Sequence, residues 1–210
     1  MAELKPLKIT CTSTNCGSNL HCFRAKKKLA GATEQGKCRD CGASLVDWSR
    51  VHRRDLTDAS NTFASLKLEL IRHHFWHIPI AAHAIRYALK KGRVQLGAAT
   101  KNQISRSIGA EAPYRDGYQT PREDSPRVNA IHYAQHATGS CCRKCLEEWH
   151  GISQGRELTE EEVTYLTALA MLYLEERIPE LNDVPQRLPK RTQRSAGAQS
   201  EMRSEPGHAA

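Results

Sequence analysis

Residues 136–150 read HATGSCCRKCLEEWH and place His136, Cys142, Cys145 and His150 in an H-x5-C-x2-C-x4-H array. Structural zinc takes four nitrogen and sulfur ligands in a tetrahedron, and a C-x2-C pair supplies two of them from one short turn. Two histidines flank this pair at close range. The array therefore predicts that a metal ion organises a compact helical region around this stretch.

The eight cysteines fall into two clusters, five within residues 11–41 and three within residues 141–145. No apolar run reaches the ~18 residues that a membrane span needs, and the N-terminus lacks the apolar segment of a signal peptide. We therefore expect a cytoplasmic protein without membrane contact, in which clustered cysteines bind metal more often than they form disulfides. The two clusters predict two Zn²⁺ sites. An iron–sulfur cluster stays open at the second, where Cys141 adds a thiol, although the nearby histidines favour zinc.

The first cluster reads as a small β zinc ribbon. Cys11-x4-Cys16 and Cys38-x2-Cys41 are the two predicted ligand pairs, and a glycine after each pair suits a tight turn. Cys22 is a fifth cysteine, which either replaces a ligand of the first pair or is buried. A site closed by four protein ligands leaves no position for substrate, so its predicted role is structural.

The remainder of the chain shows helical periodicity. Apolar residues recur at helical spacing from Asp55 to Pro79, and two more helices are predicted over about 81–91 and 98–108. A capping box at residues 159–162 predicts a helix that ends near Ile178.

The predicted fold is mainly α with a small β zinc ribbon at the N-terminus and a second metal site in a compact helical C-terminal domain. Proline and glycine mark a loop over 109–127, and the tail is too polar to fold. The predicted segments are a zinc ribbon (1–54), a basic helical region (55–111), a zinc-stabilised helical domain (112–184) and a disordered basic tail (185–210).

The net charge of +8 is unevenly distributed. Residues 1–120 carry 20 Lys and Arg against 9 Asp and Glu, whereas residues 121–184 carry 6 against 12. A basic half that also holds a zinc module predicts contact with the phosphates of DNA or RNA, although a merely soluble basic surface is the alternative. The candidate contact residues are Arg24, Lys26, Lys27, Lys28, Arg53, Arg54, Lys101 and Arg106. The acidic 121–184 region suits a protein partner, so an adaptor that bridges nucleic acid and a protein stays open.

The segments Gln135-His-Ala-Thr138, Cys142-Arg-Lys-Cys-Leu146 and Trp149-His-Gly-Ile152 carry a family resemblance. Over about residues 112–178 the chain resembles a small bacterial and phage domain family of unknown function with a QHAT…CCRxC…WHGI signature. The resemblance implies a domain boundary and brings no established activity.

A zinc-containing nucleic-acid-binding protein is the predicted function, and a metal-dependent nuclease or DNA-repair enzyme is the alternative. In the enzyme, the second site would keep three protein ligands and a water that serves as nucleophile. His132, Glu148 and Asp116 are the candidate acids and bases. The competing interpretation is that all four array residues bind zinc and His132 is only packed. The H-x-E motif of zinc deaminases is absent.

Overall fold

A computed structural model describes residues 9–24, 36–114, 116–117, 125 and 127–187. These residues form α-helices and two short 3-10 helices, η1 (Cys16–Ser18) and η2 (Leu56–Asp58), and no β-strand occurs among them. In the same residues, none of the helices combines the length and the apolar character that crossing a membrane would require. The mainly helical prediction is confirmed.

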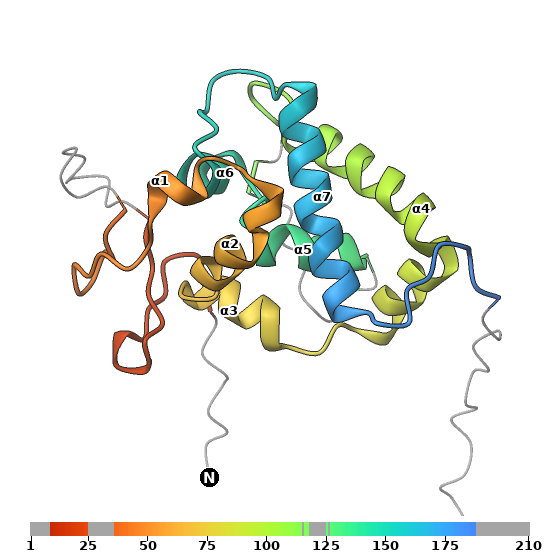
Figure 1. Ribbon diagram of the computed structural model, residues 1–210, viewed down its shortest axis with the longest axis horizontal. Coiled ribbons are helices and arrows are strands. Elements are labelled where there is room, and N and C mark those ends of the chain that lie inside the picture. The colour runs from red at the N-terminus through yellow and green to blue at the C-terminus, as the bar shows by residue number, and fades with distance from the viewer. Residues whose placement is uncertain (1–8, 25–35, 115, 118–124, 126, 188–210) are drawn as a thin grey trace, which may run out of the picture.

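Helix α7 (Glu160–Arg177) lies at the centre of the fold. The predicted capping box begins it: Thr159 Oγ1 accepts from the Glu162 N–H at 3.2 Å, and the Glu162 carboxylate accepts from the Thr159 N–H at 3.0 Å. The helix packs against α4 (Ala82–Ile108) and α5 (Ala130–Ala137), as Figure 1 shows.

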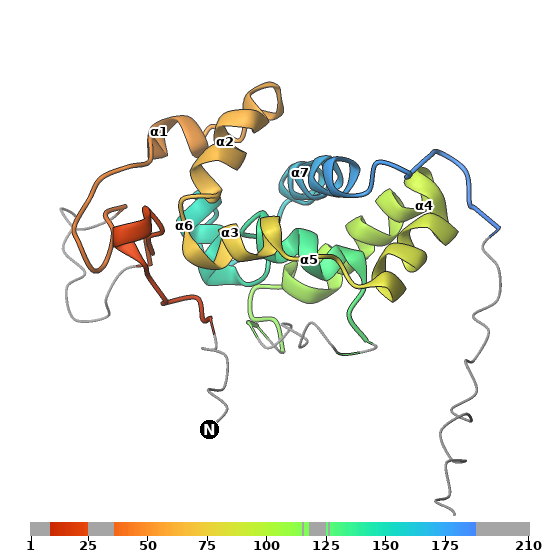
Figure 2. The same ribbon diagram turned by 90° about the horizontal axis from the view of Figure 1, so that it is seen from below.

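Helix α4 consists of two helical stretches that meet at a kink, visible in Figure 2, and two separate helices were predicted over this range. Residues 93–97, the predicted connection, are helical. The bend lies at Gly92, whose φ of 67° favours glycine. A Cβ atom there would also lie 2.4 Å from the carbonyl carbon of Val184. Both the backbone conformation and the packing therefore require glycine at this position.

The helix predicted between Asp55 and Pro79 is divided into α2 (Ala59–Leu66) and α3 (Leu70–His77). The division has a tertiary cause, because the backbone of His21 pairs with the turn between the two helices. The His21 N–H donates to Leu68 O at 2.8 Å, and the Leu70 N–H donates to His21 O at 2.9 Å. Two backbone groups of the turn are thereby satisfied outside a helix.

The main hydrophobic core includes residues between Phe23 and Ile178, from all the predicted segments except the tail, and Cys141, Cys142 and Cys145 form a smaller cluster. Within it, α3 packs against α5, and the short α1 (Trp48–Val51) packs against α6 (Arg143–His150). The division of residues 1–184 into separate segments stays a prediction.

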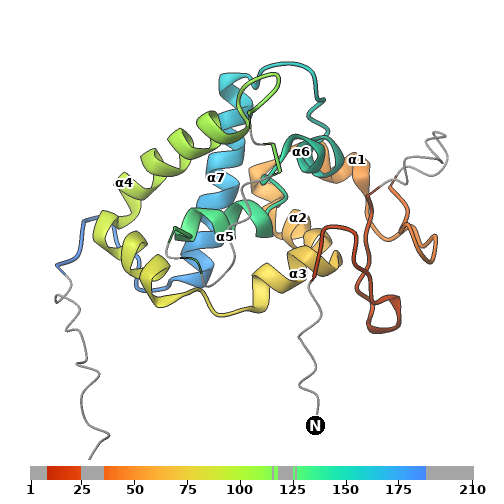
Figure 3. The same cartoon turned by 180° about the vertical axis from the view of Figure 1, so that it is seen from behind.

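The predicted β zinc ribbon is not found in the described residues. Their only β pairings are isolated bridges, Asn15 with Leu20 and His21 with Glu69. The N-terminal segment instead lies against α3 and α6, on the side of the molecule away from α4 (Figures 1 and 3). The ribbon prediction failed because this backbone pairs with a turn of the helical region rather than with a second strand of its own.

Candidate metal centres

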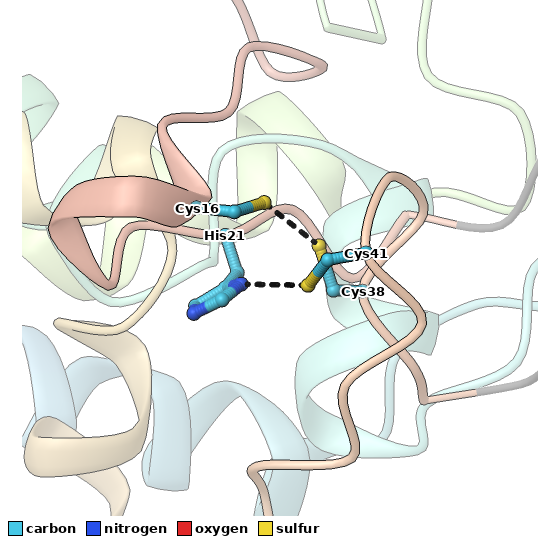
Figure 4. A group of neighbouring side chains, drawn as sticks. All are labelled: Cys16, His21, Cys38 and Cys41. Atoms are coloured by element: carbon cyan, nitrogen blue, oxygen red, sulfur yellow. Dashed lines mark hydrogen bonds between the residues drawn. The ribbon is translucent and has the colours of Figure 1, made fainter.

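The first group of candidate ligands consists of Cys16, His21, Cys38 and Cys41. Their ligand atoms all lie within 4.8 Å of one another (Figure 4). Cys16 begins η1, and Cys38 and Cys41 lie on one turn that the Gly42 N–H closes by donating to Cys38 O at 2.9 Å. Gly42 has a φ of 72°, which accounts for the glycine after the second pair.

Two separations within the first group match the edges of a tetrahedron around one zinc ion. Bonds of about 2.3 Å to sulfur and about 2.0–2.1 Å to nitrogen put two sulfurs ~3.8 Å apart and a sulfur and a nitrogen ~3.5 Å apart. The sulfurs of Cys16 and Cys38 are 3.8 Å apart. Cys41 Sγ lies 3.5 Å from His21 Nδ1. The group could therefore hold a metal ion.

The imidazole of His21 is oriented by Asn19, whose Oδ1 lies 3.0 Å from His21 Nε2. An oxygen acceptor at this position favours the proton on Nε2 and leaves the Nδ1 lone pair facing the sulfur atoms. Asn19 has a φ of 56°, in the left-handed region that asparagine tolerates better than most residues. Its backbone and side chain thus both serve the position of the His21 ring.

In the first group, the pKa of one thiol is raised and that of another is lowered. Burial raises the pKa of Cys16 to about 11, and its hydrogen bonds with Cys41 and Cys38 add to the effect. Burial also raises the pKa of Cys38, but backbone hydrogen bonds, chiefly from Cys22 and Cys41, outweigh it and bring this pKa down to about 6. Cys38 therefore favours the thiolate form more than Cys16 does, and a metal ion that binds both would displace the proton of Cys16.

The second group consists of the thiols of Cys141, Cys142 and Cys145 at the start of α6, where Cys142 is the N-cap residue. The Cys145 sulfur lies 3.7 Å from that of Cys141 and 3.3 Å from that of Cys142. The three residues are 6%, 6% and 1% exposed, in sequence order. Their burial shields the group from solvent, and the positive end of α6 favours negative charge on their sulfurs.

Arg72 is the cationic partner of the second group. It is buried, and its Nη2 donates to Cys145 Sγ at 2.9 Å. Its Nη1 donates to His136 O at 2.7 Å and lies 3.5 Å from Cys141 Sγ. A guanidinium so placed stabilises thiolates and hence a thiolate-bound metal.

Glu69 connects the two groups. Its carboxylate is 2% exposed, and Oε2 accepts from Arg72 Nε at 3.0 Å and from Trp149 Nε1 at 2.8 Å. Its backbone lies between the two hydrogen bonds that join His21 to the α2–α3 turn. Leu68 and Leu70, which bond the His21 backbone, therefore flank Glu69, whose carboxylate holds the cation beside the second group.

The thiols of the second group bind protons tightly. Each hydrogen bond between two of these thiols lowers the pKa of one partner and raises the pKa of the other. Burial raises the pKa of all three. The result is a pKa of about 12 for Cys141 and about 11 for Cys142, with that of Cys145 raised as well. A metal ion bound here would displace these protons, so its affinity would rise with pH.

Three of the four ligands predicted for the first site, Cys16, Cys38 and Cys41, lie in the first group, and His21 joins them instead of Cys11. Cys11 lies half-buried in a turn that the Ser13 N–H closes on Thr10 O. The Cys-x4-His spacing from Cys16 to His21 was the sequence signal for this ligand. It was missed because both cysteines of the first pair were assigned to one turn.

His150, a predicted ligand of the second site, does not belong to the second group. Its Nε2 donates to Thr138 O at 2.8 Å, and its Nδ1 lies 3.1 Å from Tyr165 Oη. Burial lowers the pKa of His150 to about 4. It follows Cys145 by five residues on α6, which is about 7.5 Å along the helix axis, too far to share an ion with the helix start.

His136, the other predicted histidine ligand, also lies outside the second group. Its ring stacks on Phe75 with 4.6 Å between centroids, and burial lowers its pKa to about 3. Its backbone carbonyl accepts a hydrogen bond from Arg72, and its buried Nδ1 has no hydrogen-bond partner among the described residues. Cys141, regarded from sequence as a spare thiol, is a member of the group, together with the predicted Cys142 and Cys145.

The candidate catalytic residues have contacts with the backbone at two helix starts. Asp116 Oδ1 accepts from the Arg143 N–H at 2.8 Å and so caps α6 beside the second group. His132 Nδ1 accepts from the Asn129 N–H at 3.2 Å as part of the α5 capping box. Glu148 lies in the second half of α6. The contacts of Asp116 and His132 are those of helix caps.

The basic residues predicted to contact nucleic acid have three different positions. Three of them contact other side chains of the protein: Arg24 contacts Cys142, Arg54 pairs with Glu162, and Lys101 pairs with Glu160. Those exposed at the surface are Arg53 and Arg106. Those outside the described residues are Lys26, Lys27 and Lys28. Nucleic-acid contact stays a prediction.

A family model described as "Domain of unknown function (DUF4186)" matches residues 60–175, more than half of the chain. The match begins well before residue 112, where the sequence resemblance began, and it includes α2, α3, α4 and the second group. No solved structure matches the chain.

Proposed function

The chain belongs to this family of unknown function, and we propose from its own residues that it is a zinc protein with two structural zinc centres. The observation that carries the proposal is the geometry of the first group, where the 3.8 Å and 3.5 Å separations are those of ligands around one tetrahedral zinc ion. Because four protein ligands close this centre, no position remains for a substrate, and its role is to hold structure.

The first centre would hold the N-terminal segment on the family domain. Between its ligands the segment supplies Phe23, which packs edge-on against Trp48 at 5.6 Å and Trp149 at 5.8 Å. These aromatic rings connect residues 9–24 and 36–48 to α6. The described residues of the short N-terminal segment form no sheet, so backbone pairing stabilises the segment little. Zinc binding would supply that stability instead.

The second centre would hold zinc rather than an iron–sulfur cluster. The cysteines that bind an iron–sulfur cluster are distributed over two or more irons, whereas the three sulfurs here lie within 4.8 Å of one another, a spacing that suits one ion. Burial of all three thiols supports a structural role. A nuclease would need an open metal position that a substrate can reach, and this burial gives that alternative no support.

Elemental analysis of the purified protein tests the proposal. We expect about two zinc ions per chain and no iron. Cys41→Ser should remove the zinc of the first centre and Cys145→Ser that of the second, each leaving one. Cys22→Ser is the matched control, because Cys22 is buried but belongs to neither group. A protein that purifies without zinc, and takes up none when zinc is added, would refute the proposal.

Nucleic-acid binding is the second candidate function, and the net charge of +8 favours it. Lys37 and Arg39 flank Cys38, and Arg53 and Arg106 are exposed. Fluorescence anisotropy with labelled duplex DNA and RNA should show affinity that falls steeply between about 50 and about 200 mM salt. Charge reversal at Arg53 and Arg106 should weaken it further. Absence of binding at the lower salt concentration would exclude this function.

A further inference from the structure

The C-terminal half of α3 carries a pair of histidines that belongs to neither metal centre. His73 and His77 are four residues apart and lie outside both ligand groups. Residues at this spacing are neighbours on one face of a helix. Their rings stack, with 3.9 Å between centroids and 24° between planes. The helix therefore presents the two imidazoles side by side.

Both rings are oriented by main-chain carbonyl groups through the same nitrogen. His73 Nδ1 lies 3.3 Å from Lys67 O, and His77 Nδ1 lies 2.7 Å from His73 O. Because a carbonyl oxygen only accepts, each Nδ1 carries the proton and donates it, and the lone pair of each ring is on Nε2. Metal-binding histidines almost always donate their other ring N–H to such an acceptor, which fixes the tautomer and the ring orientation. Both rings are thus prepared as Nε2 ligands.

An open pocket of about 410 Å³ lies against this pair, between α3 and the N-terminal segment. Its lining combines the histidines His73, His74 and His77 with apolar side chains. The apolar members are Ile9, Leu20, Leu70, Ile78 and Pro79. None of these lining residues carries a carboxylate or a thiol, so imidazole is the side-chain ligand that the pocket offers. Zinc, copper and nickel suit such a ligand, whereas Mg²⁺ and Ca²⁺ require oxygen.

Access from solvent distinguishes this pair from the second group of thiols. His77 is exposed and His73 is half-buried, whereas all three thiols are buried. Burial, together with the nearby His77, lowers the pKa of His73 and so favours the neutral ring that binds metal. An ion held by the two rings would therefore be reached directly from solvent.

We propose that His73 and His77 form a third metal site, which binds a divalent transition-metal ion of the class that imidazole prefers through both Nε2 atoms. Two nitrogens bound at about 2.0–2.1 Å to a tetrahedral ion are ~3.3 Å apart, and rings stacked at 3.9 Å need only a small rotation to reach that spacing. Two protein ligands leave the other positions to water, so this ion is exchangeable. The proposal does not depend on the two zinc centres, because neither histidine belongs to them.

Calorimetric titration of the untagged, zinc-loaded protein with Ni²⁺ tests the proposal. We expect one Ni²⁺ ion to bind in addition to the zinc that the protein already holds. His73→Gln and His77→Gln should each weaken this binding by at least about tenfold, the lower end of the loss seen when only a supporting partner of a ligand is removed. His83→Gln is the matched control, because the His83 ring contacts Val128 O and has no histidine four residues before or after it.

Paramagnetic broadening in NMR spectra locates the ion independently of its affinity. Ni²⁺ added below one equivalent should broaden the ring Cε1–H signals of His73 and His77 before that of His83. The two glutamine variants assign the signals, since each removes one of them.

The outcomes separate this inference from the proposed function. The inference is overturned if Ni²⁺ binds the two variants as tightly as the parent, if broadening begins at other histidines, or if no additional ion binds. A protein that purifies without zinc, takes up none at the cysteine groups and still binds Ni²⁺ through His73 and His77 contradicts the proposed function alone.

Discussion

Replacement of Arg72 by methionine tests the buried charge network most directly. Arg72 and Glu69 form an ion pair with both side chains at most 2% exposed. The substitution keeps most of the buried volume. It removes the Arg72 hydrogen bond to the Glu69 carboxylate and leaves the one from the Trp149 N–H. Removal of one member of a buried pair typically costs about 3–5 kcal/mol, a large fraction of the roughly 5–15 kcal/mol that stabilises a domain.

The expected result is a free energy of unfolding lower by about 3 kcal/mol or more. It is measured by urea denaturation in zinc-containing buffer, with tryptophan fluorescence as the signal. Arg50→Met is the matched control, because Arg50 and Asp58 form an ion pair at the surface, 45% and 25% exposed, that should contribute only about 0–1 kcal/mol.

A second substitution separates loss of charge balance from loss of packing. Glu69→Leu together with Arg72→Met removes both buried charges, and a well-packed apolar pair is often as stable as the ion pair that it replaces. The double variant should therefore be more stable than Arg72→Met alone. The reasoning is refuted if Arg72→Met costs no more than the control, or if the double variant shows no recovery.

Three further predictions concern other parts of the chain. Gly92→Ala should destabilise the protein by at least about 1 kcal/mol in thermal or urea unfolding, because φ is positive and the added Cβ would meet backbone at 2.4 Å. Gly97→Ala, at a helical position with open space, should instead stabilise it by about 0.5–1 kcal/mol, and equal effects would contradict the structure. Asn19→Gly keeps the left-handed backbone but removes the acceptor for the His21 ring, so zinc affinity of the first centre should fall about 10- to 100-fold in chelator competition; unchanged affinity would show that the ring needs no such support. The hydrogen bond from Arg156 is the main cause that lowers the pKa of Glu162 to about 2, so the stability that this carboxylate adds is complete above its unfolded pKa of about 4.3 and is lost as the pH falls toward 2. Glu162→Gln should remove that part of the acid dependence of unfolding, and identical acid profiles of variant and parent would disprove the assignment.

Sequence patterns predicted best the features that depend on neighbouring residues. The capping box at Thr159 begins α7 as expected. The turn from Cys38 to Cys41 presents two thiols to one point, because C-x2-C spacing fixes both on the same few backbone bonds. Local geometry determines both features, so the local sequence was enough.

Features that depend on distant contacts were beyond this reasoning. The break between α2 and α3 exists because His21, more than forty positions earlier, pairs with the intervening turn. Arg72 and Glu69 gave no metal-site signal in the sequence, since their connection to Cys145 arises only when α3 packs beside α6. The array of residues 136–150 placed histidines near cysteines along the chain, but helix geometry directs the rings of His136 and His150 to other partners.

The position of Glu69 has a consequence for how the protein acquires metal. Its peptide groups adjoin a ligand of the first centre, and its carboxylate holds the cation of the second. Ordering at either centre should therefore favour ordering at the other. Such a coupling is reciprocal. If zinc at the first centre raises the zinc affinity of the second centre by some factor, zinc at the second centre raises the affinity of the first by the same factor. Under zinc shortage the population should then divide into fully loaded and empty chains, with singly loaded ones scarce.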